Sequence, residues 1–371
     1  MRHLALGAIL LAVLAAPAWA KKWNPKQERE IGEKVCVQVD KEYKRWEDEA
    51  ALARVKTIVD AIAAKSDRPD VQYDVRLVDD AEVNAFSIPG GFIYMTKGLV
   101  GEAQSDAELA GVLAHEIAHN CTYDALDQAE RSRKLFMGAL GAALVSIVLG
   151  AKGDIVATTA QAGLYVRQGM LSRYSLEVES QADRNAVRYL VKSGYNPVGL
   201  LTFMERLARK ERREMPEEAG VFETHPLSRE RVAALIDQIT AAGVTVNRRA
   251  VMQWRKPEVQ EVEIAGGKWP AVTWWDQRVL AVVGPDEATA KTRAEEINGK
   301  LTAALAQGAQ RSDFTLAGRD EGLALVASRE PVLIVTQEDA KAQETTREAL
   351  AEAAHTAIRR ALTQERFAYQ F

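Results

Sequence analysis

Apolar residues at helical spacing predict a helix in the middle of the N-terminal half. Four of them share one face: Leu109, Val112, Leu113 and Ile117. The preceding residues, Ser105-Asp106-Ala107-Glu108, have the form of a capping box, in which the hydroxyl bonds the amide of Glu108 and that carboxylate reaches back. We therefore expect this helix to begin at Ser105.

A second amphipathic run begins after Ser175. Its expected buried stripe consists of Ala186, Val187, Leu190 and Val191. Gly194 and Pro197 follow the run, and this order is typical of a helix end, because glycine adopts the left-handed conformation and proline cannot continue a helix. The pattern predicts a helix over about residues 175–193.

Two β-rich segments precede the first helix. Residues 71–78 alternate between apolar and polar, and residues 92–96 are β-rich after a Pro-Gly-Gly turn. Two strands here could offer an open edge to which an extended peptide adds through main-chain hydrogen bonds. A plain hairpin packed on the core fits the pattern equally well.

The C-terminal part of the chain has an α+β pattern. Expected strands lie at 279–283, 314–316, 323–327 and 332–336, with helices at 287–307 and 337–362. The charged, Trp-bearing stretch 247–270 precedes them. The fold class we predict is α+β: a mostly helical domain with a small sheet at 21–246, a linker at 247–270, and a smaller α+β domain at 271–371. The Arg293-Ala294 and Asp339-Ala340 pairs make this domain resemble a small extracytoplasmic domain found beside some bacterial mechanosensitive channels and proteases, which suggests a recognition or docking role.

The first residues have the pattern of a secretory signal peptide. Arg2 and His3 precede an apolar run, and Ala18-Trp19-Ala20 is a small-x-small cleavage site. We expect residues 1–20 to be removed and the mature chain to lie in the periplasm. An uncleaved anchor is the alternative, although the run is short for a span. With 48 basic and 52 acidic residues interspersed, nothing in the charge indicates nucleic-acid binding.

The stretch His115-Glu116-Ile117-Ala118-His119 carries the candidate chemistry. Histidines four apart stand on adjacent turns of one helix, so both imidazoles can bind one Zn²⁺, and Glu116 can serve as a general base. The alternatives are two titrating surface histidines or a structural metal site. Cys121 is the only nearby candidate to close a structural site, and it faces away from His119.

The third ligand separates families with this motif. One class would have Gly and His at positions 122 and 125, where this chain has Thr122 and Ala125. The other class takes a Glu from a second helix. Glu179 and Asp183 are four apart, so Glu179 can ligate while Asp183 accepts the outward N–H of a ligand histidine. Glu177 is the competing candidate for the third ligand, but it lies off the face that Glu179 and Asp183 share. The alternative without a metal is that these acidic residues only begin a helix, where the macrodipole favours negative charge.

These motifs resemble the M48 family of zinc metallopeptidases of the bacterial envelope, gluzincins related to the CAAX prenyl endopeptidases. The matching stretches are 108–119, 179–183, 84–91 and 224–226, within about residues 25–240. Leu176, Ala186 and residues 120–122 depart from the family pattern, which bears on substrate preference.

The resemblance implies a zincin-like fold and one Zn²⁺ per chain. It makes His115, His119 and Glu179 the metal ligands and Glu116 the general base, with Asp183 supporting a ligand histidine. It also favours a substrate edge formed by Asn84, Ala85, Phe86, Gly90 and Gly91.

His225, in Thr224-His225-Pro226, is the other candidate catalytic residue. Two roles stay open: a hydrogen bond to the oxyanion of the transition state, or a fourth metal ligand that holds the enzyme latent.

The uncharged stretch 135–151 lies between Lys134 and Lys152. Because the candidate ligands on either side must return to one site, a buried or membrane-touching helix hairpin through about residue 165 fits better than a membrane span. Cys36 and Cys121 could pair in an oxidising compartment, or remain free buried thiols.

We expect a periplasmic zinc endopeptidase that removes unfolded or misassembled envelope proteins. The alternative is a chaperone or assembly factor in which the zinc site is latent or mainly structural. An intact Glu116 favours the enzyme, because a binding protein needs no base between its ligands.

Overall fold

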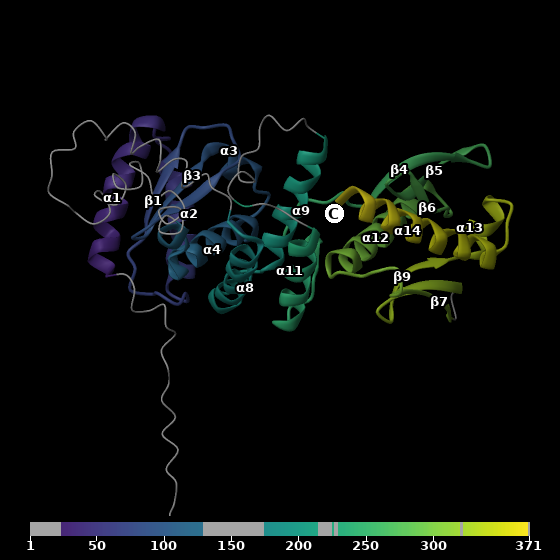
Figure 1. The fold of residues 1–371 in the computed structure, drawn as a ribbon. Coiled ribbons are helices and arrows are strands. Elements are labelled where there is room, and N and C mark those ends of the chain that lie inside the picture. The colour runs from purple at the N-terminus through teal and green to yellow at the C-terminus, as the bar shows by residue number, and fades with distance from the viewer. Residues whose placement is uncertain (1–23, 129–173, 214–224, 226–228, 320–321, 370–371) are drawn as a thin grey trace, which may run out of the picture.

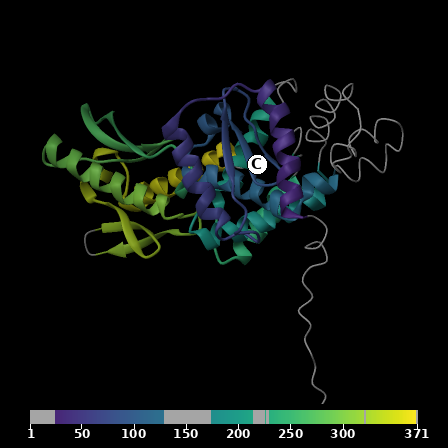
Figure 2. The ribbon, with the colours of Figure 1, turned by 90° about the vertical axis from the view of Figure 1, so that its left-hand side faces the viewer.

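The computed structural model describes residues 24–128, 174–213, 225, 229–319 and 322–369. The expected signal peptide and the hairpin at 135–165 lie outside these residues. The fold is α+β, as predicted. Figure 1 shows an N-terminal half, coloured purple to teal, beside a C-terminal module, coloured green to yellow, and Figure 2 views the molecule from the α1 end.

The N-terminal half consists mainly of helices around one apolar core. Its elements are α1 (Pro25–Glu42), α2 (Glu49–Ala63), β1 (Asp74–Val78), β2 (Ala85–Ile88), β3 (Phe92–Thr96), α3 (Lys97–Glu102), α4 (Asp106–Thr122), α8 (Leu176–Ser193), α9 (Val198–Arg213) and α11 (Arg229–Ala241). Helix α4 lies in the centre of this half and packs against α2, α8 and α9.

Helix α4 begins where the capping pattern predicts. The Ser105 hydroxyl accepts the amide of Glu108 at 3.3 Å. The Glu108 carboxylate, however, accepts the amide of Gln104 at 2.7 Å instead of that of Ser105, and it also receives two hydrogen bonds from Arg206 of α9. The helix ends at Tyr123, whose φ of 59° is left-handed. The cap therefore also ties α4 to α9.

Helix α8 also has the predicted ends. Ser175 caps it through the amide of Val178, and Gly194 ends it with a φ of 83°. The prediction that Val191 belongs to the buried stripe is wrong, because this side chain is 40 % exposed. Tyr189 is buried instead and donates to Asp67 at 2.8 Å.

Glycines allow α4 and α9 to approach closely. A Cβ on Gly111 would lie 2.6 Å from the backbone of Leu200, and one on Gly199 would lie 2.1 Å from the carbonyl oxygen of Ala107. Only residues without side chains fit at this crossing. The crossing fixes the helix that carries the His-Glu motif against its neighbour.

The small sheet has the order β1-β3-β2, with β1 parallel and β2 antiparallel to β3. The sequence pattern did not predict β2. Strand β1 was predicted from residue 71 but begins at Asp74. Among the residues that the structure describes, β2 is an edge strand of this sheet, and it contacts α4.

The C-terminal module has its own core and two three-stranded antiparallel sheets. Its elements are β4 (Glu258–Ile264), β5 (Gly267–Trp274), β6 (Gln277–Ala281), α12 (Glu287–Ala306), β7 (Phe314–Arg319), β8 (Gly322–Ala327), β9 (Glu330–Val335), α13 (Gln337–Ala342) and α14 (Arg347–Tyr369).

Two expectations for this module need correction. The segment 258–270, taken as part of a linker, forms a hairpin of β4 and β5, because its mixed polar pattern belongs to a strand with little burial. The expected helix 337–362 is two helices, broken at Glu344 with a φ of 52° and restarted where Thr346 caps the amide of Ala349 at 3.1 Å.

The junction between the halves is held by ion pairs on both sides. It contains the short turn η3 (Arg248–Ala250). Arg248 binds the carboxylate of Glu205 on α9 with two contacts of 2.7 and 2.8 Å, while Arg249 pairs with Glu365 on α14. Consecutive residues are thus anchored in different halves of the molecule.

Cys36 and Cys121 are both free and buried. They lie in separate apolar clusters, so the disulfide considered from sequence is absent. Within the described residues, no helix combines the length and apolar character that crossing a membrane requires.

Candidate metal centre

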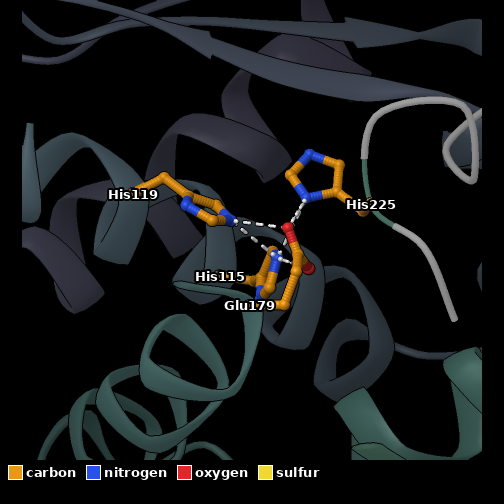
Figure 3. A group of neighbouring side chains, drawn as sticks. All are labelled: His115, His119, Glu179 and His225. Carbon is orange, nitrogen blue, oxygen red and sulfur yellow. Dashed lines mark hydrogen bonds and ion pairs between the residues drawn. The ribbon is translucent and has the colours of Figure 1, made fainter. Parts of the chain in front are cut away.

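Four buried side chains converge on one point in the N-terminal half. His115, His119, Glu179 and His225 each offer one ligand atom, and these atoms lie within 4.8 Å of one another. Figure 3 shows the two α4 histidines facing Glu179 of α8, with His225 completing the group. The sequence named all four residues as site candidates, and the fold brings them together from three separate segments.

The two α4 imidazoles are oriented by carboxylates. Nδ1 of His115 lies 3.0 Å from Oδ1 of Asp183, and Nδ1 of His119 lies 2.8 Å from Oδ2 of Asp124. The carboxylate of Asp124 accepts from an Nδ1–H of His119, which makes Nε2 the lone-pair nitrogen of that ring in its neutral form, whereas Nδ1 of His115 meets Asp183 as a close ion-pair contact. The two Nε2 atoms then face each other at 3.0 Å.

Two imidazole nitrogens at this distance need either a proton shared between them or a metal ion that both can bind. Oε1 of Glu179 lies 3.5 Å from Nε2 of His119, and Oε2 lies 3.4 Å from Nε2 of His115. Two imidazole nitrogens and one carboxylate oxygen are a usual donor set for a catalytic divalent metal. The residues present therefore fit a metal ion.

The pKa values of these groups reflect the excess of buried negative charge. Burial alone would lower the pKa of His119, but hydrogen bonds with Asp124 and Glu179 raise it to about 10. Burial would raise the pKa of Glu179, yet the neighbouring His225, His115 and His119 hold it well below its ordinary value. Without a metal, protons on the imidazoles supply the positive charge that the carboxylates require.

His225 lies between the ligands and Glu116. Its Nδ1 is 2.9 Å from Oε1 of Glu179 and 3.3 Å from Nε2 of His115, while its Nε2 is 3.5 Å from Oε1 of Glu116. Glu116 itself is 2 % exposed and carries its carboxylate into the same enclosed space. The closed group of four ligand atoms matches the form of a site whose last coordination position is filled.

Three residues near the site were not identified from the sequence. Asp124 follows the left-handed Tyr123, which turns the chain back toward His119, and a polar residue after a helix end is not a specific signal. Tyr174 stacks on His119 with ring centres 4.5 Å apart and an interplanar angle of 14°. Arg231 of α11 pairs with both Asp183 and Glu179, and only the packing of α11 on α8 reveals it.

Strand β2 runs beside α4, where Nδ2 of Asn120 donates to the carbonyl oxygen of Ile88 at 3.0 Å. The carbonyl oxygen of Asn84 accepts the amide of Thr96 on β3. Because bonding alternates along an antiparallel pair, residues 84, 86 and 88 bond to β3, and the main-chain groups of Ala85 and Ser87 point to the open edge. Of the predicted edge residues, Ala85 therefore has main-chain groups on the open side, while the main-chain groups of Asn84 and Phe86 bond to β3.

The glycine turn does not belong to that edge. Glu28 of α1 accepts the amide of Gly90 at 2.9 Å, and Arg29 donates to its carbonyl oxygen at 2.7 Å. A Cβ on Gly91 would lie 2.8 Å from the carbonyl oxygen of Gln72. Assigning Gly90 and Gly91 to a peptide-binding edge was wrong, because α1 and the segment before β1 cover them.

A small pocket adjoins the site at the end of β2. Its volume is about 10 Å³, and it is lined by Glu28, Ser87, Pro89, His119, Asn120, Tyr123, Ala125 and Leu126. In the C-terminal module, by contrast, the described residues hold no comparable group of metal ligands. There Nε2 of His355 lies 3.1 Å from the carbonyl oxygen of Phe314.

Comparison with protein-family models gives two matches. Residues 49–239 match the model described as peptidase family M48. Residues 271–365 match a domain of unknown function, DUF8459. The first match covers all four converging side chains.

Several curated proteins are similar to the N-terminal half. The beta-barrel assembly-enhancing protease of Escherichia coli K12 is 34 % identical over 162 residues, which is 42 % of this chain and 32 % of that protein. Metalloprotease LoiP of the same organism is 28 % identical over 238 residues, 63 % of this chain and 89 % of that protein. The mitochondrial metalloendopeptidase OMA1 of Schizosaccharomyces pombe is 24 % identical over 190 residues, 51 % of this chain and 53 % of that protein. The chain thus spans about a third of the length of the first of these relatives.

Proposed function

We propose, on the premise that this chain belongs to peptidase family M48 and is a metalloendopeptidase, that its metal is zinc and that it acts on proteins of the bacterial envelope. The observation that carries the proposal is the pair of Nε2 atoms 3.0 Å apart, each ring held from behind by a carboxylate. His115, His119 and Glu179 would hold the ion. A zinc ion bound there would supply Lewis-acid chemistry, polarising the scissile carbonyl and acidifying water.

Glu116 is the residue placed to move protons. It follows His115 on α4, and its buried carboxylate faces the same space as the ligands, 3.5 Å from Nε2 of His225. It would take a proton from the attacking water at Oε1 and return it to the leaving amine. Its surroundings exclude bulk solvent, which strengthens each of these interactions.

His225 gives the site a latent form in our proposal. Its Nδ1 lies among the ligand atoms, where it would close the coordination sphere. Turnover then requires His225 to leave the ligand group, after which its ring could donate to the developing oxyanion. The two roles considered from the sequence, a fourth metal ligand and a hydrogen-bond donor to the oxyanion, then correspond to two positions of the His225 side chain.

The open edge at Ala85 and Ser87 supports a peptide substrate in extended form. Main-chain bonding to an edge strand makes little demand on substrate sequence, which suits an enzyme that acts on unfolded chains. The name of the first relative mentioned above refers to beta-barrel assembly. By analogy we propose quality control of misfolded or misassembled envelope proteins, in the periplasm, after removal of residues 1–20.

A cleavage assay on an unfolded protein such as casein tests the proposal. The purified protein should cut casein, lose activity with a chelator and regain it with one equivalent of Zn²⁺. Glu116→Gln should retain the metal and lose activity by a factor of about 10² to 10⁴. A metal-loaded protein that cuts nothing, in wild-type form and as His225→Phe, would favour the chaperone alternative.

His225→Phe separates the two positions of that side chain. If the latent form dominates, the variant should cleave faster and release zinc sooner. If only the oxyanion contact matters, cleavage should fall by about 10²-fold with zinc retained. Unchanged cleavage and unchanged zinc release would contradict both roles.

A further inference from the structure

Arg231 makes a buried contact with a ligand that the metal chemistry described above does not use. It lies in the first turn of α11 and is 5 % exposed. Its Nη1 lies 2.6 Å from Oε2 of Glu179, while Nε and Nη2 bind the two oxygens of Asp183 at 3.0 and 2.9 Å. One guanidinium thus holds both acidic residues of α8 that face the site.

Helix formation does not explain a cation at this position. The N-terminal turn of a helix carries positive partial charge, so an arginine there is disfavoured by the macrodipole. Burial of an unpaired guanidinium is also costly, and its pKa stays raised only because Asp183 and Glu179 outweigh desolvation. The carboxylates on α8 account for the presence of the charge.

The two oxygens of Glu179 have different neighbours. Oε1 faces His119 and His225, at 3.5 and 2.9 Å. Oε2 lies 2.6 Å from Nη1 of Arg231, as an ion pair, and 3.4 Å from Nε2 of His115. A carboxylate can ligate a metal through one oxygen or through both, and an oxygen held in a short ion pair is a poor second ligand.

We propose that Arg231 is a positioning residue that restricts Glu179 to ligation through one oxygen, and so keeps one coordination position free for the substrate. The inference rests on the proposed metal site and adds a determinant of its coordination number. Through Asp183, the same guanidinium fixes the carboxylate that orients His115.

Cobalt(II) in place of zinc reports coordination directly, because four-coordinate cobalt absorbs visible light more strongly than five- or six-coordinate cobalt. In Arg231→Met, Oε2 is released and can join Oε1 as a ligand. We expect the visible absorption per bound cobalt to fall about twofold or more, and cobalt affinity to fall about 10- to 100-fold as Glu179 and Asp183 lose their anchor.

Arg206→Met is the matched control. Arg206 is half-buried and binds both oxygens of an acidic residue, the buried Glu108 on α4, at 2.7 and 2.8 Å. Its loss should lower the thermal unfolding temperature and leave the cobalt spectrum unchanged. Arg231→Lys, which keeps the charge but offers no planar fork, should give a spectrum between those of wild type and Arg231→Met.

Arg231→Gln covers the case in which Arg231→Met does not fold, and should show the same loss of absorption. A wild-type spectrum in either folded variant would overturn the inference while leaving the proposed function standing. A wild-type protein that binds neither cobalt nor zinc would instead overturn the proposed function.

Discussion

The two halves of the molecule both bury charge, but they use it differently. In the C-terminal module, the buried Asp339 accepts the amides of Val283 and Thr336 at 3.0 Å each, and both of its oxygens bind Arg293. In the N-terminal half, the buried carboxylates of Glu179 and Asp183 and the half-buried carboxylate of Asp124 surround two imidazoles whose Nε2 atoms face each other.

The two clusters differ in whether the protein supplies a partner for every buried polar group. Asp339 has a protein partner for each oxygen, so its network stabilises the fold and has no capacity left for a ligand. At the metal centre Arg231 supplies one positive charge to Glu179 and Asp183, and the carboxylates there still exceed it, so the remaining positive charge comes from added protons or from an ion. A buried cluster that does not satisfy itself indicates a binding function, whereas a satisfied one indicates a structural role.

Asp339→Ala gives the largest effect expected from this comparison. The change leaves Arg293 partly buried without its partner, so we expect a loss of about 3–5 kcal/mol in stability of the C-terminal module. Chemical unfolding followed by tryptophan fluorescence measures it, since the module contains Trp274 in its core. Zinc content of the folded variant should not change; a variant that loses zinc while folded would contradict the division between the two clusters.

Asp124→Ala should change zinc binding more than the stability of the fold. Removing the carboxylate behind His119 frees the ring to rotate and change tautomer, so zinc affinity should fall about 10- to 100-fold. Competition with a chromophoric chelator measures the change. Thr122→Val, which removes only the hydroxyl that donates to the same carboxylate at 2.7 Å, is the control and should bind zinc nearly as wild type does.

Proton release on metal binding tests the charge argument itself. Because the pKa of His119 is raised to about 10 in the metal-free protein, its imidazole holds a proton at pH 7 that zinc must displace. Apparent affinity should therefore rise about tenfold per pH unit for each proton released, equivalent to 1.4 kcal/mol.

Calorimetry in two buffers of different ionisation enthalpy counts these protons. The corresponding stabilisation of the metal-free protein is fully present below the ordinary pKa of 6.5 and is lost as pH rises through about 10. Binding without proton release at pH 7 would show that the rings are neutral before the metal arrives.

The smallest effect is expected where a pair is exposed. Asp106, at the start of α4, binds Arg54 at 2.7 Å, but the two side chains are 60 % and 40 % exposed. Asp106→Asn should change stability by less than about 1 kcal/mol. A loss as large as that for Asp339→Ala in the same unfolding assay would mean that burial does not decide the contribution of these pairs.

Local sequence patterns predicted the ends of α4 and α8. They also predicted three of the four converging residues, His115, His119 and Glu179, as metal ligands. Ser105, Ser175 and Gly194 act on their own neighbours in sequence, so the pattern of residues around them is sufficient. His115 and His119 also meet by helix geometry alone.

The residues that were missed depend on contacts distant in sequence. Arg231 lies 48 positions from Asp183, and nothing around it distinguishes it from a surface arginine. Strand β2 has four residues and is recognised only by its pairing with β3. The hairpin at 258–270 was assigned to a linker because β4 has no buried residue and lacks a strong apolar alternation.

Arg248 and Arg249 at the junction have a mechanical consequence. Since adjacent residues are anchored in opposite halves, the peptide unit between them cannot rotate without breaking one of two ion pairs, with Glu205 or with Glu365. The two ion pairs therefore limit how far one half can turn relative to the other at this junction, and the loss of either pair would remove that limit.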